Sequence, residues 1–395
     1  MAKKKYVYFY GFGKENTEGD ASMKAILGGK GANLAEMANA NLPVPAGFTV
    51  STEACAYYSS HNNKYPEGMM EQLKAQLKKL ETKMKKKLGD PKNPLLVSVR
   101  SGAAISMPGM MDTVLNLGLN DKSVLGFIES TGNARTGWDC YRRFIDMFGD
   151  VVMGPTTGLS HHDFEVAMTE LKKKYGAKED TDLTADQLKE LCEIYKKVYV
   201  QKVKKPFPQD PFEQLLAAVN AVFGSWNSER AVKYRQINKV TGLLGTAVNV
   251  CSMVYGNMGD ESGTGVAFTR DGATGDEAPM GEYLINAQGE DVVAGIRTPK
   301  HIDEMPSEKS PIWKKAHAQL MTIMKKLEKH YKYPQDVEFT VEQGTLWMLQ
   351  TRNAKRTGLA GVRWAVEMAT GKDFYTGKAQ DKILKPDEAI CTLSG

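Results

Sequence analysis

The segment from Asp336 to Arg352 carries two acidic side chains two residues apart at its start, Asp336 and Glu338, and an amide and a basic side chain two residues apart at its end, Gln350 and Arg352. The apolar residues between them, and a Gln-Gly pair midway, predict two short strands joined by a turn. Because strand side chains alternate between two faces, Asp336 and Glu338 share a face, as do Gln350 and Arg352 on the returning strand. Two carboxylates, an amide and a guanidinium are therefore expected to meet at one end of a hairpin.

Such a group of side chains has two interpretations. Hard oxygen ligands suit Mg²⁺, and Mg²⁺ in proteins usually binds together with phosphates. The alternative is a polar strand face with a structural ion pair, since charges beside apolar strand positions must be paired.

A second candidate is the run Gly29-Lys30-Gly31, where the pattern predicts the start of a helix. The first N–H groups of a helix have no partner within the helix and attract anions, to which Lys30 adds a positive charge. The run is not a Walker A loop, because Gly31 follows the lysine where that motif needs Ser or Thr. The alternative is a solvent-exposed lysine near a tight turn.

Two further regions could approach a ligand through their backbone. Arg100 ends an apolar strand and precedes a loop rich in glycine and methionine, in which Gly109 permits close backbone approach. The glycines between 256 and 265 could form a nest of N–H groups for phosphate, and the strand before them could face a purine ring. A surface loop and a plain hairpin are the alternatives.

Composition bounds the class of protein. At 395 residues, with 42% hydrophobic and 25% charged residues, the chain predicts roughly two to three globular domains. A net charge of +5 does not indicate nucleic-acid binding. Five widely spaced cysteines and no long apolar run indicate a soluble protein of a reducing compartment, without membrane spans. The six histidines form neither a metal-binding nor a triad pattern.

The order of elements predicts an α+β protein. Strand patterns and helices alternate up to about residue 120 and return from 246 onward, including strands at 247–255 and 291–294. Helical periodicity dominates 121–204, and three prolines follow it. We therefore expect a helical insertion in an α+β body.

Several motifs together resemble the pyruvate phosphate dikinase family over residues 5 to 360. They include Gly-Gly-Lys-Gly-Ala-Asn-Leu-Ala-Glu-Met at 28–37, Met-Pro-Gly-Met-Met-Asp at 107–112, Ala-Gln-Gly-Glu-Asp-Val-Val-Ala-Gly-Ile-Arg at 287–297 and Leu-Gln-Thr-Arg-Asn at 349–353. The resemblance implies an ATP-grasp fold with two α+β subdomains and a helical insertion. Its expected parts are 1–120 completed by 205–245, the insertion 121–204, the second subdomain 246–355, and a linker 356–395 toward a phosphohistidine domain.

The resemblance also implies roles for individual residues. Lys30, Arg100 and Arg352 match cations that contact phosphate and act in catalysis, and Glu338 and Gln350 match the Mg²⁺ ligands. The other residues expected to bind ATP are Gly109, Met253, Val254, Thr264, Gly265, Glu290 and Asp336.

The implied reaction interconverts ATP, phosphate and pyruvate with AMP, pyrophosphate and phosphoenolpyruvate. This chain would host the first half, in which a histidine attacks the β-phosphorus of ATP, AMP leaves, and inorganic phosphate takes the terminal phosphoryl group. The phosphohistidine domain and the barrel that binds pyruvate or phosphoenolpyruvate would lie elsewhere in a longer enzyme, cytoplasmic or in an organelle. The alternatives are a non-catalytic nucleotide-binding module and a free-standing ATP-grasp ligase.

Overall fold

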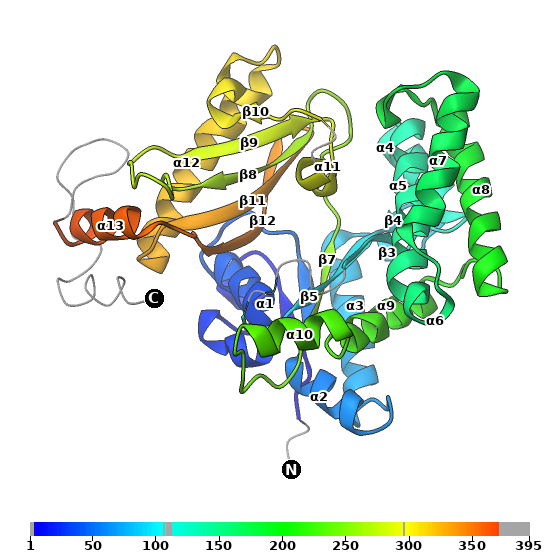
Figure 1. Ribbon diagram of the computed structural model, residues 1–395, viewed down its shortest axis with the longest axis horizontal. Helices are drawn as coiled ribbons and strands as arrows, with labels where there is room; N and C mark the ends of the chain where they lie inside the picture. Colours follow the sequence, from blue (N-terminus) through cyan, green and yellow to red (C-terminus); the bar gives the residue numbers. More distant parts are fainter. Residues whose placement is uncertain (1–3, 106, 108–112, 295–296, 371–395) are drawn as a thin grey trace. The chain divides into compact units, whose positions relative to one another are not determined.

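The computed structural model describes residues 4–105, 107, 113–294 and 297–370 (Figure 1). The chain divides into two compact units. Unit 1 comprises Met1–Asn41 and Pro45–Met253, and unit 2 comprises Leu42–Val44 and Val254–Gly395. Each unit combines a β-sheet with helices, as the α+β prediction requires.

Within its described residues, unit 1 contains a five-stranded antiparallel sheet. The strand order is β1 (Val7–Tyr10), β2 (Gly47–Val50), β7 (Ala247–Ser252), β5 (Val97–Gly102) and β6 (Thr113–Leu117). Strand β7 therefore comes from a distant part of the sequence and completes the sheet between β2 and β5.

The two faces of this sheet differ in polarity. One face is apolar and buried, and it carries Val7, Phe9, Phe48, Val50, Val99 and Val250. Helix α3 (Met69–Met84) covers part of it, with Lys79 lying over the Phe9 ring. The opposite face carries Tyr10, Thr49, Arg100 and Asn249, because residues paired across antiparallel strands point to the same side.

Helix α1 (Lys24–Asn39) packs on this polar face, and glycine decides its shape. The helix starts at Lys24, earlier than predicted, but Gly28 interrupts it with φ of 67°. That left-handed conformation suits glycine. A Cβ at Gly28 would also lie 1.7 Å from the carbonyl oxygen of Gly102, so the two backbones meet there. The second part of α1 thus begins at Gly29-Lys30-Gly31, where the sequence predicted a helix start.

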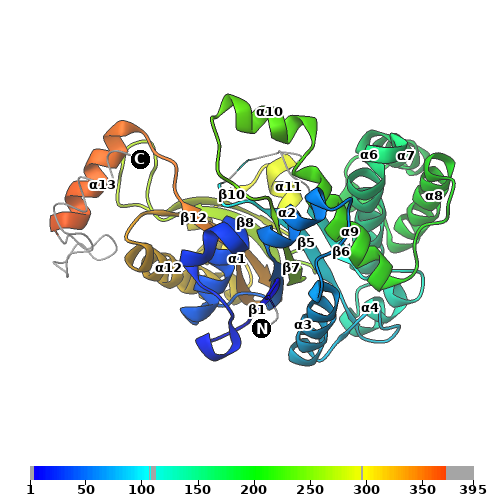
Figure 2. The same ribbon diagram turned by 90° about the horizontal axis from the view of Figure 1, so that it is seen from below.

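The remaining helices of unit 1 include a cluster formed by α4, α5, α7 and α8 (Figure 1), which Figure 2 shows from below. Local signals set their ends: Asn133 caps α5, and Thr184 with Gln187 forms a capping box at α8. The elements are α2 (Thr52–Ser60), β3 (Lys87–Leu88), β4 (Pro94–Leu95), α4 (Ser123–Thr131), α5 (Ala134–Met147), a π-helical turn at Phe148–Met153, α6 (Gly154–Thr157), α7 (His161–Tyr175), α8 (Ala185–Val203), α9 (Pro211–Ser225), α10 (Glu229–Ile237) and short 3₁₀ turns at Lys14–Asn16, Ala21–Met23 and Asp180–Asp182.

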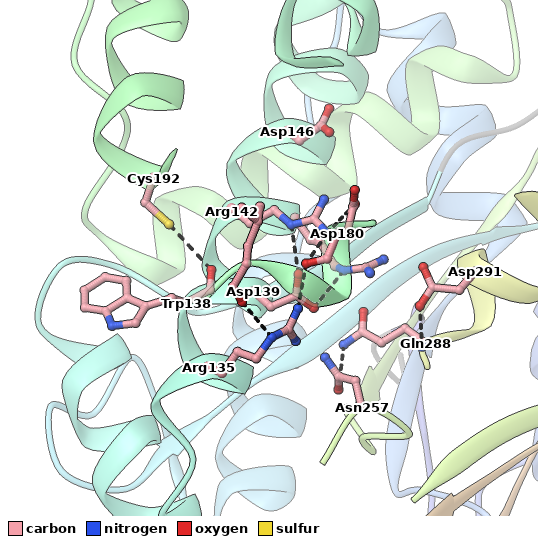
Figure 3. A network of polar contacts seen from close by, with 12 residues as sticks. Arg135, Trp138, Asp139, Arg142, Asp146, Asp180, Cys192, Asn257, Gln288 and Asp291 are labelled. Carbon is pink, nitrogen blue, oxygen red and sulfur yellow. Dashed lines mark hydrogen bonds and ion pairs between the residues drawn. The ribbon is translucent and has the colours of Figure 1, made fainter. Parts of the chain in front are cut away.

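A largely buried ionic network is centred on α5 of this cluster (Figure 3). Asp139 of α5 binds the guanidinium groups of Arg142, at 2.8 Å, and Arg143, at 3.1 Å. Arg142 continues to Asp180, which also binds Lys172 of α7. Although burial alone would raise the pKa of Asp139, the two arginines hold it below its ordinary value. The network ties the Asp180 turn to α5 and α7.

Within its described residues, unit 2 contains a second five-stranded antiparallel sheet. Its order is β10 (Lys300–His301), β9 (Met280–Ile285), β8 (Gly263–Phe268), β11 (Gln335–Glu342) and β12 (Thr345–Asn353). Helix α12 (Pro311–Tyr331) contacts β11 and β12. The unit also contains α11 (Gly289–Ala294), a 3₁₀ turn at Ile302–Ser307 and α13 (Gly358–Thr370).

A buried arginine connects the elements of unit 2. Arg270, just after β8, is fully buried and binds Glu328 of α12 and Glu367 of α13. Residues 42–44 join this unit through a hydrogen bond from Met348 N to Pro43 O at 2.8 Å. In the described part of the chain, no helix is both long and apolar enough to span a lipid bilayer.

Two strand predictions were wrong in part. The strand expected at 247–255 ends at Ser252. Residues 291–294, expected as a strand from their paired valines, belong to helix α11. Asp291 accepts a hydrogen bond from Gln288 N at 2.9 Å and its own N–H donates to Gln288 O. This capping at the helix start outweighs the strand preference of valine.

Candidate functional site

The hairpin of β11 and β12 brings the predicted acidic, amide and basic residues together. Asp336 lies opposite Arg352, and Glu338 lies opposite Gln350. Arg352 Nε donates to Asp336 Oδ2 at 2.6 Å, and Gln350 Nε2 donates to Glu338 Oε1 at 3.0 Å. The predicted hairpin and the meeting of these four side chains are confirmed.

A β-bulge determines which face of β12 these residues occupy. The register shifts between Glu338 and Phe339, so that Leu349 is the extra residue between Gln350 and Met348. Met348 is fully buried opposite the core residue Phe339. Without the bulge, Met348 and Gln350 would share a face. The extra residue therefore lets β12 place Met348 in the core and Gln350 on the polar face.

Burial shapes the electrostatics of the hairpin. Asp336 is buried, which raises the pKa of its carboxyl above the ordinary value, and nearby Glu338 acts in the same direction. The ion pair with Arg352 opposes both effects. The Arg352 side chain is 45% exposed, so Asp336 holds the guanidinium while much of it stays accessible.

The amide of Gln350 presents a buried acceptor. A carboxylate accepts hydrogen bonds, so the Gln350 NH₂ must face Glu338 and its oxygen must face away. Within the described residues, that buried Oε1 has no hydrogen-bond partner. A buried oxygen without a donor fits a cation ligand. No group of three or more His, Cys, Asp or Glu residues in the described chain could hold a metal ion, so the donor set here is one carboxylate and one amide.

In unit 1 the structure brings Lys30 and Arg100 to one face of β5. Gly29 N donates to Ala103 O at 2.8 Å, which holds the second part of α1 against the end of the strand. A Cβ at Gly102 would lie 3.3 Å from the Lys30 Cβ. Gly102 is two residues beyond Arg100 and so shares its face. Both cations are half-buried.

Arg100 also influences buried groups on the same face. Tyr10 Oη and Cys251 Sγ lie 2.7 Å apart. Burial raises the pKa of the Tyr10 hydroxyl and of the Cys251 thiol, and the positive charge of Arg100 acts in the opposite direction on both pKa values. The Arg100 guanidinium is therefore close enough to stabilise negative charge on the polar face of the sheet near β7.

The other predicted residues are more scattered. Met253 follows β7 and donates its N–H to Leu96 O at 2.9 Å, and Val254 is the next residue, in unit 2. Thr264 and Gly265 lie within strand β8, so the strand begins before Thr264 rather than after it. Thr264 Oγ1 donates to Phe339 O at 3.0 Å, which fixes its hydroxyl in the sheet. Glu290 lies in the first turn of α11.

Gly109 lies outside the described residues. Arg297, also part of the matched motif, donates to the carbonyl groups of Asn286, at 3.1 Å, and Ile285, at 2.8 Å, and so braces the loop before α11. Sequence reasoning missed Asn249, a fully buried amide in β7 between Thr49 and Arg100. Its signal was a polar residue between two valines of an apolar strand.

Comparison with known proteins defines the class. The family model described as "Pyruvate phosphate dikinase, AMP/ATP-binding domain" matches residues 24–67, 64–309 and 301–371. The chain belongs to this nucleotide-binding family.

Relatives specify the resemblance further. "Pyruvate, phosphate dikinase 1, chloroplastic" of Arabidopsis thaliana is 53% identical over 375 residues, which are 95% of this chain and 38% of that protein. "Pyruvate, phosphate dikinase 2" of Zea mays is 53% identical over 95% of this chain and 41% of its own length. "Pyruvate, phosphate dikinase" of Giardia intestinalis is 53% identical over 92% of this chain and 41% of its own length. The chain thus spans less than half the length of these relatives.

Proposed function

We propose that the chain is the ATP-grasp part of a pyruvate phosphate dikinase and binds Mg·ATP. The two α+β subdomains would be residues 1–120 with 205–245, and residues 246–355. Residues 121–204 form the helical insertion, and 356–395 lead toward the phosphohistidine domain. The family membership and the relatives' names support this assignment.

The proposed reaction begins when a histidine nitrogen on a separate domain attacks the β-phosphorus of ATP. The bond from that phosphorus to the oxygen shared with the α-phosphate breaks, and AMP leaves with this oxygen. The terminal phosphoryl group then passes to inorganic phosphate and yields pyrophosphate. The phosphohistidine that remains phosphorylates pyruvate on the barrel of the full-length protein, giving phosphoenolpyruvate.

The observation that carries the proposal is the Glu338–Gln350 pair, with its buried amide oxygen in need of a positive partner. These two residues would hold Mg²⁺, and two protein ligands leave coordination positions for phosphate oxygens and water. Bound there, the ion would neutralise charge on the phosphates.

The chain's own cations have complementary tasks. Lys30 and Arg100 come from unit 1 and Arg352 from unit 2, and all three would contact the polyphosphate. Arginine binds two oxygens with a planar fork, whereas lysine acts as a point charge. Asp336 keeps Arg352 oriented through their 2.6 Å contact. Phosphoryl transfer needs mainly such alignment and charge neutralisation.

The rest of the proposed site surrounds the nucleotide. Met253 and Val254 would line the adenine, and Gly109 would approach the phosphates through its backbone. Thr264, Gly265 and Glu290, all in unit 2, would also contact the nucleotide.

The test supplies the chain with Mg·ATP, inorganic phosphate and a separately produced phosphohistidine domain of a pyruvate phosphate dikinase. The expected products are AMP and pyrophosphate, separated by anion-exchange chromatography. ADP as the product would indicate a free-standing ligase instead. Nucleotide binding without any product would favour a non-catalytic module and contradict the proposal.

A further inference from the structure

Asn249 occupies an unusual place for a polar side chain. It is fully buried in the middle of β7, between Val248 and Val250. A buried amide costs free energy unless its polar atoms are bonded, so an apolar residue would be the ordinary choice here. Its position in the register, opposite Arg100 on one side and Thr49 on the other, places it on the polar face of the sheet.

The amide is held from two sides. Its Oδ1 accepts a hydrogen bond from Thr49 Oγ1 at 2.9 Å. Its Nδ2 donates to the carbonyl oxygen of Arg100 at 3.5 Å. Because the Arg100 carbonyl oxygen can only accept, the NH₂ group of the amide must face it, and the amide oxygen is then left to accept from Thr49. The Asn249 side chain therefore contacts the backbone of the residue proposed to bind phosphate.

Two glycines make room for this amide. A Cβ at Gly31 would lie 2.7 Å from Asn249 Oδ1, and a Cβ at Gly102 would lie 2.6 Å from Asn249 Nδ2. Gly31 directly follows Lys30, and the same Cβ at Gly102 would lie 3.3 Å from the Lys30 Cβ. The amide thus fills the space between the start of the second part of α1 and the end of β5.

We infer that Asn249 is a positioning residue that sets the separation of Lys30 and Arg100, the two cations of unit 1 that would bind the nucleotide's phosphates. This inference rests on the proposed function. Asn249 itself does not touch the nucleotide: it acts through Gly31, Gly102 and the Arg100 carbonyl group. Loss of the Asn249 side chain should therefore weaken the binding of a triphosphate more than the binding of a monophosphate, because a monophosphate makes fewer contacts with the two cations.

The test measures the affinities of the whole chain for Mg·ATP and for AMP by titration calorimetry. Asn249→Ala should weaken Mg·ATP binding about tenfold, as expected for one or two lost polar contacts, and AMP binding much less. The matched control is Val250→Ala, the next residue of β7, which faces the apolar side and touches neither glycine. It should lower stability but leave the ratio of the two affinities unchanged.

A double-mutant cycle with Lys30→Ala separates positioning from general weakening. If Asn249 acts through Lys30, the losses in Mg·ATP affinity should be clearly less than additive. Thr49→Val provides a second, gentler probe, because it removes only the hydroxyl group that orients the amide. It should lower the Mg·ATP affinity in the same direction, and it serves also if Asn249→Ala does not fold.

The outcomes separate the inference from the function on which it rests. A wild-type chain that does not bind Mg·ATP, or binds it independently of Lys30, overturns the proposed function. Lys30-dependent binding with an unchanged affinity ratio in Asn249→Ala, or in Thr49→Val where the former is unfolded, overturns only the role of Asn249.

Discussion

At the residue scale, the hairpin assigns different tasks to two similar pairs. Asp336 binds Arg352 at 2.6 Å and orients a cation that is still 45% exposed. Glu338 binds Gln350 at 3.0 Å and orients a neutral amide whose oxygen is buried. The first pair suits contact with an anion and the second suits contact with a cation, as the proposed binding of Mg·ATP requires.

The arginines can be tested individually. Arg100→Ala and Arg352→Ala should each lower the rate of AMP formation by about 10²–10³, since each would remove a contact to charge that develops in the transition state. The rate is measured with the phosphohistidine domain supplied, and circular dichroism should show an intact fold. Arg363→Ala is the control, because Arg363 also forms an ion pair and its side chain is 40% exposed. Wild-type rates in Arg100→Ala or Arg352→Ala would contradict the assignment.

At the element scale, a single extra residue in β12 separates the core from the site. Leu346 and Met348 are buried on the apolar side, whereas Gln350 and Arg352, two and four positions further, lie on the polar side. In a regular strand, residues separated by two or four positions share a face. The bulge at Leu349 is what puts Met348 and Gln350 on opposite faces.

Because Leu349 is the extra residue, its deletion should spare the site, whereas deletion of a neighbouring residue should not. Without Leu349, Gln350 follows Met348 directly, and ordinary alternation still places Gln350 opposite Glu338 and Arg352 opposite Asp336. We therefore expect nearly wild-type Mg·ATP affinity in this variant. Deletion of Thr351 would instead place Arg352 opposite Val337, on the apolar face, and should lower both the stability and the Mg·ATP affinity, the latter by about tenfold or more. Calorimetry on both variants measures the difference, and equal affinities would show that the face of β12 that Arg352 occupies has no part in binding.

At the scale of the whole molecule, the residues proposed to bind the nucleotide are divided between the two units: Lys30 and Arg100 belong to unit 1, and Glu338, Gln350 and Arg352 belong to unit 2. A ligand that binds only the folded chain stabilises it by an amount that grows with the logarithm of the ratio of ligand concentration to Kd. The ionic network around Asp139 and the Arg270 contacts stabilise each unit by itself and contribute no residue to the proposed site.

Thermal unfolding tests whether residues of each unit contribute to nucleotide binding. Mg·ATP at about 100 times its Kd should stabilise the chain by about 2.7 kcal/mol and raise Tm. The shift should shrink in Lys30→Ala, a change in unit 1, and in Glu338→Ala, a change in unit 2. In Glu338→Ala the part of the shift that depends on Mg²⁺ should disappear, as a magnesium titration at fixed ATP would show. If Mg·ATP raises the Tm of either variant as much as that of the wild-type chain, the replaced residue does not contribute to binding.

Local sequence signals predicted much of this molecule. Alternation and the Gln-Gly pair predicted the β11–β12 hairpin, and helical periodicity predicted the helices observed between residues 121 and 204. They failed at α11, which formed where two valines favour a strand, because Asp291 caps a helix there. They also failed at Thr264, which belongs to β8 because β9 and β11 pair with it on both sides.

The order of residues by itself determined which chemistry is present: oxygen ligands at alternating positions, a lysine between helix-starting glycines, and an arginine at a strand end. Alternation and helix capping act over a few residues, so such features can be recognised without a fold. The bulge at Leu349, the kink at Gly28 against Gly102, and the place of Asn249 beside Thr49 and Arg100 were decided only by tertiary structure. The kink and the Asn249 contacts depend on segments far apart in sequence that pack against one another. The bulge depends on which residues of β12 enter the core, and close packing leaves no local trace in the sequence.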